Sequence, residues 1–499
     1  MDAPTAPVAA IKYIAVDRNQ LRWEALDLDR LIPADHAARI IWEVSASFDL
    51  SGFEEQKKST EGSAGRPCWP PQLLVSLWVY AYSIGVASAR AIERLMEHEP
   101  AMRWLAGGEV INHHTLADFR VQHKAALEDL FAQFLALLDS EGVLDLSTIL
   151  HDGTKVRTVA GRSSFHRKQT LEKRLRKARK VVRELDRRAE QDGEAQDQRR
   201  EAAQRRAAQH KVERLQAAVH RIQALERTTP AGGHADLRVS ETEADARNMK
   251  QPDGGWAPSY NVQVSTEAQS RMIVAVGVTN AANDTQELLP ALERVAENCG
   301  EWPQQVIADK GYASRENVEQ TAERGVDLIA PWKDDRSREA GACATNSIAP
   351  EFVPSAFRAQ AGGRELTCPA GHRLVVIQQK RHHGVSKQVF EASAIDCRAC
   401  AFRRPCCGNR EGPRRIERVI ESEAMRTYLV RMKRRAVQLL YRKRSEIAEF
   451  PNMWMKSVKK WRRFSVRGLV KADTEALWVA LSYNMSQWIR IRAATNAVA

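Results

Sequence analysis

The sequence predicts an α/β protein with a helical N-terminal region, an inserted helical hairpin and a small cysteine-rich insertion. Three observations favour this fold class. Short apolar strands alternate with helical patterns between residues 258 and 323, which is typical of an α/β sheet. Residues 36–140 instead carry only helical patterns, and residues 171–225 repeat apolar positions at spacings of three and four. Five of the eight cysteines fall within residues 368–407, where they mark the second insertion.

Composition limits the kind of protein and its partners. At about 150 residues per domain, 499 residues suggest about three folding units, and 43% apolar side chains exclude a wholly disordered chain. The 76 Lys and Arg residues outnumber the 63 Asp and Glu residues, which gives a net charge of +13. Such an excess favours a polyanionic partner, with nucleic acid ahead of an anionic membrane surface.

A membrane or secreted protein is not expected. The uncharged stretch at residues 67–89 is long enough to raise the question of a membrane span, but its three prolines and its polar residues favour a buried helix. The N-terminus lacks the basic and apolar regions of a signal peptide. Eight cysteines in so long a chain do not make a disulfide framework, so we expect a reducing compartment.

Residues 1–140 are expected to form a helical N-terminal domain. Residues 73–84 are apolar on most sides, which predicts a buried helix. Ser88 is a suitable N-cap for the next helix, and Gly107-Gly108 is a suitable end for the one after it.

Residues 168–233 are expected to form a helical hairpin inserted into the α/β domain. Their apolar positions make two narrow seams, interrupted by Asp192-Gly193 and surrounded by Arg, Lys and Glu. Two interpretations fit this pattern equally: a solvated coiled-coil arm that does not touch DNA, and an arm that contacts DNA. The seam residues are Leu171, Leu175, Ala178, Val182, Leu185, Ala189, Val212, Leu215, Val219, Ile222 and Leu225.

The α/β region carries two aspartates at the expected ends of strands. Asp152 follows a short apolar strand and precedes glycine, and Asp309 follows another and precedes Lys310-Gly311. An acid at the carboxyl end of a strand in an open α/β sheet lies where ligands bind. For either aspartate alone, the ordinary alternative is a turn residue, because aspartate tolerates and caps tight turns.

The C-terminal region is strongly basic and contains two candidates for a third acid. Residues 426–467 contain fourteen Lys and Arg but only Glu446 and Glu449 as acids, so their net charge is +12. A carboxylate in this positive field either forms ion pairs or holds a cation that lies against phosphate. Three converging carboxylates can hold two Mg²⁺ ions about 3.5–4 Å apart, while the surrounding cations position a phosphodiester backbone.

Short motifs occur in a defined order along most of the chain. In the N-terminal region they are Gly65-Arg66-Pro67, Leu73-Leu74-Val75, Ala91-Ile92-Glu93-Arg94-Leu95, Arg103-Trp104-Leu105-Ala106-Gly107-Gly108 and His114-Thr115-Leu116-Ala117-Asp118-Phe119-Arg120. The later ones are His151-Asp152-Gly153-Thr154-Lys155, Tyr260-Asn261-Val262-Gln263, Asn283-Asp284, Ala308-Asp309-Lys310-Gly311-Tyr312, Glu475-Ala476-Leu477-Trp478 and Tyr483-Asn484. In this order they resemble the bacterial insertion-sequence transposases of the DDE type, in which a helical domain precedes the catalytic core.

The resemblance implies an RNase H-like mixed sheet flanked by helices, with Asp152, Asp309 and Glu449 as ligands of two Mg²⁺ ions, for which Mn²⁺ substitutes. The family's third acid lies in a Tyr-Arg-Glu-Lys signature, and Glu449 is preferred to Glu446 because it stands seven residues before Lys456. The DNA-binding residues of this region are then Tyr441, Arg444, Lys456, Lys459, Lys460, Arg462 and Arg463.

The surroundings of Glu449 depart from this family pattern. Many relatives continue with Pro-Val-Phe-Gly, whereas this chain continues with Phe450-Pro451-Asn452. Proline favours the first turn of a helix or ends one, which predicts that Glu449 lies at a helix start and not in mid-helix. The spacing of 140 positions from Asp309 to Glu449 also indicates an insertion.

The cysteines lie in this insertion and have two interpretations. The first is a structural Zn²⁺ site, because Cys397 and Cys400 have CxxC spacing and Cys368 and Cys406 can complete a tetrahedral set. In that case Cys407 or His372 are the substitute ligands. The second is a set of reduced thiols in a small subdomain, which fits equally because Cys368 has no partner at CxxC spacing.

The expected organisation is a DNA-end-binding helical domain (1–140), an RNase H-like core (141–167 and 234–334), the hairpin (168–233), the cysteine-rich insertion (335–415) and the basic end of the core (416–499). The resemblance implies metal-dependent cleavage at insertion-sequence ends, followed by attack of the freed 3′-hydroxyl on target DNA. It also implies double-stranded DNA and a homodimer or larger synaptic assembly as partners, and the nucleoid in the bacterial cytoplasm as location. The alternatives are a nuclease without strand transfer, a decayed DNA-binding protein, and a scaffold that leaves the two aspartates unexplained.

Overall fold

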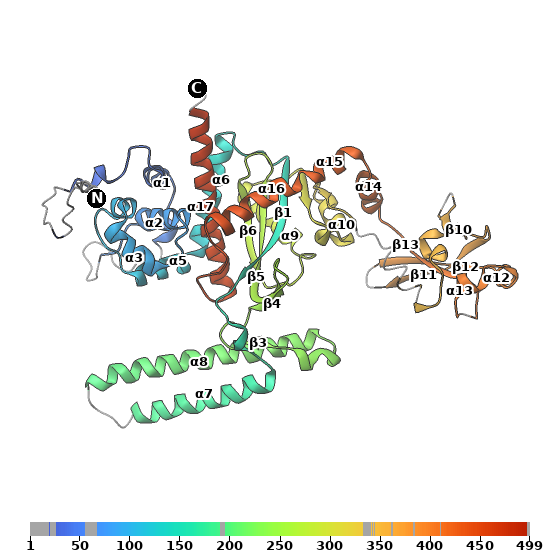
Figure 1. The fold of residues 1–499 in the computed structure, drawn as a ribbon, viewed down its shortest axis with the longest axis horizontal. Coiled ribbons are helices and arrows are strands. Elements are labelled where there is room, and N and C mark those ends of the chain that lie inside the picture. Colours follow the sequence, from blue (N-terminus) through green and yellow to red (C-terminus); the bar gives the residue numbers. More distant parts are fainter. Residues whose placement is uncertain are drawn as a thin grey trace, which may run out of the picture.

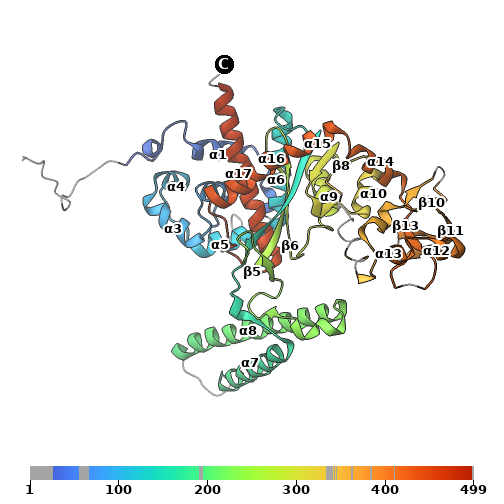
Figure 2. The same cartoon turned by 45° about the vertical axis from the view of Figure 1, so that its right-hand side comes forward.

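The computed structural model describes residues 19, 26–54, 67–189, 195–332, 341, 343, 345–360, 363–382, 385–409 and 411–496. Gly65 and Arg66 of the first motif and the Asp192-Gly193 turn lie outside these ranges. Figures 1 and 2 show a central sheet with helices on both sides, from which the hairpin and the cysteine-rich insertion project. No helix in the described ranges is both long and apolar enough to cross a membrane.

The central sheet is a mixed sheet, as the alternation of strands and helices predicts. Its strand order is β6-β5-β1-β7-β8, and β4 pairs with the outer part of β5. β1 runs parallel to β7 and antiparallel to β5. The strands are β1 (Thr148–Arg157), β4 (Arg247–Lys250), β5 (Trp256–Glu267), β6 (Ile273–Thr279), β7 (Gln305–Ala308) and β8 (Asp327–Ile329).

Helices flank this sheet where the apolar patterns require them. α9 (Leu288–Cys299) packs on β5 and β6 and ends at Gly300, whose φ of +79° suits glycine. α10 (Arg315–Glu323) begins where Ser314 accepts a hydrogen bond from the amide of Asn317. The predicted strands over residues 258–282 and the helix from residue 315 to residue 323 are confirmed.

The N-terminal region is helical, as predicted. Residues 73–83 belong to a helix with nearly every side chain buried, and Ile84, which follows it, is exposed. Ser88 caps the next helix by accepting from the amide of Ala91. Gly107 and Gly108 both have positive φ after the fourth helix. The helices are α1 (Ala37–Ala46), α2 (Pro71–Ser83), α3 (Ala89–His98), α4 (Pro100–Leu105), α5 (His113–Gln122) and α6 (Lys124–Ser140).

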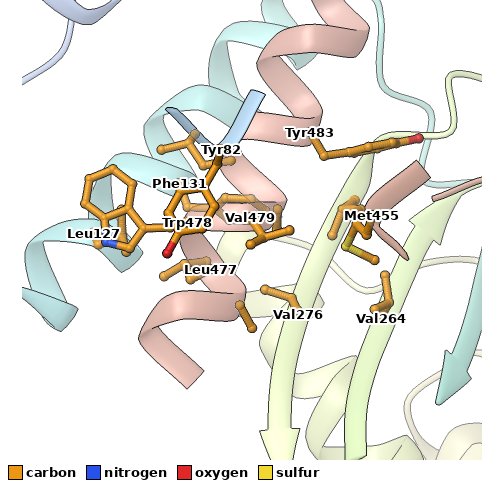
Figure 3. Packing of buried hydrophobic residues seen from close by; sticks show 14 of the residues in the cluster. Tyr82, Leu127, Phe131, Val264, Val276, Met455, Leu477, Trp478, Val479 and Tyr483 are labelled. Carbon is orange, nitrogen blue, oxygen red and sulfur yellow. The ribbon is translucent and has the colours of Figure 1, made fainter. Parts of the chain in front are cut away.

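The last helix, α17 (Leu469–Asn496), joins this helical region to the sheet. It contacts α2, α5 and α6 on one side and β6 on the other. Figure 3 shows Trp478 of α17 among Leu127 and Phe131 of α6, with Val276 of β6 close by. Arg120 of α5 donates to Ser465, which donates to the buried Glu475 of α17. Motifs at opposite ends of the chain therefore form one packed interface.

The basic C-terminal region approaches the sheet through a series of short helices. α16 packs against β1 and β5, and the following η8 is a π-helical turn. The elements are α14 (Glu423–Arg431), α15 (Arg435–Arg442), α16 (Arg444–Met453) and η8 (Trp454–Val458).

The inserted hairpin consists of α7 (Lys168–Ala189) and α8 (Ala195–Thr228). A short ribbon of β2 (Phe165–His166) and β3 (Val239–Ser240) connects it to the core. The predicted seam is confirmed from Leu171 to Val182 and from Val212 to Leu225, which pack in one cluster. Leu185 is not part of this cluster, and the side chain of Ala189 lies outside the described part of the structure. Figures 1 and 2 both show the hairpin projecting beyond one end of the central sheet.

The cysteine-rich insertion is a separate five-stranded antiparallel sheet with its own core. Its strand order is β13-β12-β11-β10-β9, with two short helices, and its cluster of buried residues is distinct from the main one. The elements are β9 (Arg358–Ala359), β10 (Glu365–Thr367), β11 (Arg373–His382), β12 (Val385–Ala392), α12 (Ala394–Ala399), α13 (Arg403–Cys407) and β13 (Arg415–Val419).

Candidate active site

The structure brings Asp152 and Asp309 together on neighbouring strands. His151 pairs with Ala308 in the parallel β1–β7 ladder, so the two aspartates that follow lie side by side. Burial raises the pKa of Asp152, and the negative charge of Asp309 raises it further. The prediction that the first strand ends near Asp152 is wrong, because pairing with β5 carries β1 on to Arg157 whereas β7 ends at Ala308.

Two cations of the Tyr-Arg-Glu-Lys signature reach the same place. Arg444 Nη2 lies 3.1 Å from Asp152 Oδ1, and its positive charge opposes the raised pKa of that carboxyl. Lys456 Nζ donates to Thr154 Oγ1, two residues further along β1. Burial lowers the pKa of Lys456, and the charge of Asp152 opposes this shift. Both cations are therefore held against the aspartate strand.

Glu449, the predicted third acid, belongs to α16, the helix that packs on β1. The backbone of Glu449 lies within this helix, and its side chain is outside the described part of the structure. Glu446, on the same helix, is exposed. The prediction that Glu449 begins a helix is wrong. Pro451 lies inside α16, near its C-terminal end, where the loss of one N–H bond is accommodated and a π-helical turn follows.

The other predicted DNA-binding residues divide into two groups. Tyr441 packs in an apolar cluster with Leu150 and Ile307 beneath the aspartates. Lys459 Nζ lies 4.4 Å from the ring centroid of Trp454. By contrast Lys460, Arg462 and Arg463 are exposed in the segment that follows η8. The backbone of Arg463 forms an isolated parallel β-bridge with Arg157 at the end of β1.

A third carboxylate, Asp284, lies beside these groups and was given no role from the sequence. Its Oδ1 accepts from Asn261 Nδ2 at 2.5 Å and from Gln263 Nε2 at 3.0 Å, and it lies 3.5 Å from Lys155 Nζ. The signal was present, because these residues belong to three of the motifs. Their sequence separation concealed the contact.

Gly153 is required by this arrangement. A Cβ at this position would lie 2.7 Å from both Asp284 Oδ1 and Gln263 Nε2, and 3.0 Å from the Tyr312 hydroxyl. Distances this short are not tolerated between real atoms, and the surrounding groups are held by hydrogen bonds. The glycine of the His151-Asp152-Gly153 motif thus leaves room for a polar network beside the aspartates.

The centre of that network is a buried, neutral histidine. Tyr312 donates to Gln263 Oε1 at 2.6 Å, and His151 Nε2 lies 2.9 Å from the same oxygen. Because this oxygen only accepts, His151 carries its proton on Nε2, and Nδ1 accepts from the Ser265 hydroxyl at 3.0 Å. Burial lowers the pKa of His151 to about 4, which keeps the ring uncharged at neutral pH.

The chemistry of the donor set fits a divalent cation of the Mg²⁺ type. Asp152 and Asp309 supply hard carboxylate oxygens, and their mutual repulsion in a half-buried position is relieved when a cation binds. Among the described residues, no three His, Cys, Asp or Glu side chains form a complete metal centre. Asp152 and Asp309 are thus placed to share a cation, and α16, which carries Glu449, packs on the same strand.

The cysteines of the insertion line one small cavity. Cys368, Cys397, Cys400 and Cys406 face it together with His372 and Cys407. Cys368 Sγ accepts from the backbone amide of His372 at 3.2 Å, across a turn in which Gly371 has φ +88°. Burial raises the pKa of Cys406 to about 12.

Two family models match the chain. The model described as a transposase DDE domain matches residues 226–485, which is more than half of the chain, and a transposase domain, DUF772, matches residues 26–122. The chain therefore belongs to the DDE transposase family, and the central sheet is its RNase H-like core. It is a DNA transposase of the insertion-sequence type. No curated protein and no solved structure matches the sequence.

The limits of the first match agree with the organisation of the core. The matched residues include Asp309 and Glu449 but begin after Asp152. The hairpin α7–α8 separates Asp152 from the rest of the core in sequence. In the fold, β1 lies between β5 and β7 and pairs with both, so Asp152 is part of the same sheet.

Proposed function

We propose that this transposase cleaves the ends of an insertion sequence by metal-dependent hydrolysis and joins the freed 3′-hydroxyl to target DNA. The observation that carries the proposal is the parallel register of β1 and β7, which sets Asp152 beside Asp309 with Arg444 on the same carboxylate. Two carboxylates on adjacent strands and a third on a packed helix suit the two-metal chemistry of phosphodiester bonds.

Asp152, Asp309 and Glu449 would hold the metal ions. Mg²⁺ bound there supplies activation of the attacking oxygen and stabilisation of the leaving oxygen. Arg444, which pairs with Asp152 in this structure, would also bind a phosphate of the DNA, since a guanidinium binds either anion. Lys456 and the exposed Arg462 and Arg463 continue the positive surface along β1, where a DNA backbone is neutralised.

The test is cleavage of a duplex that carries the terminal repeats flanking the gene. Asp152→Ala, Asp309→Ala and Glu449→Ala should each abolish Mg²⁺- or Mn²⁺-dependent nicking while DNA binding persists. Glu446→Ala is the matched control and should cleave normally. A precut end with a free 3′-hydroxyl then separates transposition from hydrolysis, because a nuclease without strand transfer produces no joined product. A wild type that binds the ends and never cuts them would show a decayed DNA-binding protein.

We also propose that the cysteine cavity holds a structural Zn²⁺ through Cys368, Cys397, Cys400 and Cys406. The support is that these thiols line one small cavity and that Cys368 Sγ accepts an amide hydrogen bond. In the described structure no three of them are already placed as metal ligands, so zinc would have to draw them together. Metal analysis of protein purified without chelator should give one zinc per chain, and Cys397→Ala should remove it. Cys299→Ala, outside the insertion, is the control. Zinc-free wild-type protein that is stably folded would leave these residues as reduced thiols.

The active form is proposed to be a homodimer or larger assembly on double-stranded DNA, acting in the bacterial cytoplasm at the nucleoid. Light scattering of the protein with and without its terminal repeats measures the assembly directly.

A further inference from the structure

The helix α7 has two faces of opposite character. Leu171, Leu175 and Ala178 are buried against α8. Residues spaced by three and four positions share one face of a helix, so the opposite face is a continuous stripe. We call it the α7 outer face. It consists of Lys173, Arg176, Lys177, Lys180 and Arg183, all of which are exposed.

The cations of the α7 outer face are not neutralised by the part of the protein that the structure describes. The ion pairs of this helix use other residues. They join Lys168 to Glu226, Arg174 to Glu241, Asp186 to Arg205, and Glu184 to both Arg187 and Arg188. Like charges three and four positions apart destabilise a helix. The stripe therefore opposes the stability of α7, which indicates a use outside the free protein.

The partner helix provides an internal comparison. The side of α8 away from the seam carries Ala203, Arg206, His210, Glu213, Ala217, His220 and Ala224, all exposed. Its charges are mixed and sparse, as expected of a merely solvated helix. The single sign of the charges on α7 is thus a property of one face and not of the whole hairpin.

The hairpin is attached at the end of the strand that carries the active-site aspartate. From Asp152, β1 continues through Lys155 and Arg157, and Arg463 forms a bridge beside it. At the base of the hairpin, burial lowers the pKa of Arg247, and the nearby positive charge of Arg221 on α8 lowers it further. Figures 1 and 2 show the hairpin beyond this end of the sheet. Positive charge thus continues from the core to the hairpin.

We infer that the α7 outer face binds the phosphate backbone of double-stranded DNA outside the catalytic site. The stripe from Lys173 to Arg183 is about 15 Å long, which is the length of about four base pairs. A second copy of the chain is a poorer fit, because coiled-coil pairing needs an apolar stripe and all five positions here are cationic. The inference rests on the proposed function and adds a second DNA-contacting surface to it.

The experiment compares two triple variants with the same change in net charge. Arg176→Gln, Lys177→Gln and Lys180→Gln remove three cations from the α7 outer face. Arg206→Gln, Arg214→Gln and Arg227→Gln remove three exposed cations from α8. Binding to a mixed-sequence duplex of about 40 base pairs is measured in EDTA over a range of salt concentrations, so that no cleavage step enters. Circular dichroism confirms that both variants are helical.

The α7 variant should lower the slope of log affinity against log salt by about three, near one per lost phosphate contact, and the α8 variant should leave it near wild type. Footprinting should show a corresponding loss of about four protected base pairs. Equal changes in both variants would mean that only net charge matters and would overturn the inference. Unchanged slopes in the α7 variant would also overturn the inference. The same holds if the α7 variant differs from wild type only in its oligomeric state without DNA, because the face would then bind a second copy of the chain. Wild-type protein that fails to bind DNA would overturn the proposed function as well. If the α7 variant binds DNA with the salt dependence of wild type and cleaves normally, only the inference is overturned.

Discussion

At the edge of the central sheet, charged side chains are half-buried and paired; along α7, they are exposed and unpaired among the described residues. Arg444 holds Asp152 and Lys155 lies near Asp284, each within 3.5 Å. Lys173, Arg176 and Lys177 on the hairpin point to solvent. Charges fixed at short range in a partly dry site are weakly screened, whereas exposed charges are screened by salt over about 10 Å. The sheet edge is thus suited to positioning reacting groups, and the hairpin to collecting DNA.

Among the changes that distinguish the two regions, the largest loss of cleavage activity is expected from Gly153→Ala. Gly153→Ala places a Cβ 2.7 Å from Asp284 Oδ1 and Gln263 Nε2, so the polar network beside the aspartates has to move. Displacement of about 1 Å costs about 100-fold in rate, and we expect at least that loss of cleavage. Gly232→Ala on the connection after the hairpin has nothing within 4 Å of its new Cβ and should be silent. Full activity of Gly153→Ala would contradict the described network.

A pH effect should also be confined to the sheet. Burial lowers the pKa of His151 to about 4 from its ordinary value of 6.5, so the unfolded chain binds the extra proton first. The free energy of unfolding should therefore fall as the pH drops from 6.5 towards 4, by up to about 3 kcal/mol from this group.

In His151→Gln, the free energy of unfolding should fall less between pH 6.5 and pH 4 than in wild type, as measured by denaturant unfolding at each pH. His220→Gln, a change at an exposed position of α8, should retain the pH dependence of the wild type. Identical pH dependence in His151→Gln and wild type would show that the histidine is not held neutral.

A smaller effect is expected from the cation at the aspartate. The Arg444 charge opposes the burial that raises the pKa of Asp152, so Arg444→Gln should raise that pKa further. Cleavage needs the ionised carboxylate, and its acid limb should move to higher pH, with a loss of about tenfold per pKa unit on that limb. The slope of log DNA affinity against log salt should change by no more than about one, which corresponds to one phosphate contact. A pH profile identical to that of wild type would contradict the ion pair's role.

The smallest effect is expected from an exposed ion pair on the hairpin. Arg187 and Glu184 lie 2.7 Å apart on α7, with more than a third of each side chain exposed. Arg187→Gln should change the free energy of unfolding by less than about 1 kcal/mol. A larger loss in thermal or denaturant unfolding would mean that the hairpin charges stabilise the fold, and the contrast with the sheet would fail.

The predictions from sequence succeeded where periodicity or local chemistry determines the structure. The buried helix at residues 73–84, the N-cap at Ser88 and the seam between α7 and α8 all depend on short-range patterns. The adjacency of Asp152 and Asp309 follows from the parallel register of β1 and β7, although Asp152 lies within β1 and not after it.

Other features depend on contacts between distant positions, which one sequence does not reveal. Asp284 accepts from Asn261 and Gln263 across more than twenty residues, and Arg120 reaches Ser465 across 345. The helix through Pro451 was missed because packing of α16 on β1 outweighs the local preference of proline. Tyr441 was grouped with the DNA-binding residues because it belongs to the signature. That its side chain packs in an apolar cluster could not be predicted from one sequence.

The most direct test of the account is a titration of the protein with Mn²⁺, followed by electron paramagnetic resonance, on wild type, Asp152→Asn and Asp309→Asn. Asp253→Asn, an exposed acid paired with Arg157, is the control. The account predicts that each active-site variant binds Mn²⁺ at least about tenfold more weakly than wild type, while the control is unchanged. Undiminished Mn²⁺ binding by both active-site variants would contradict the claim that the paired strands of the sheet form the metal site.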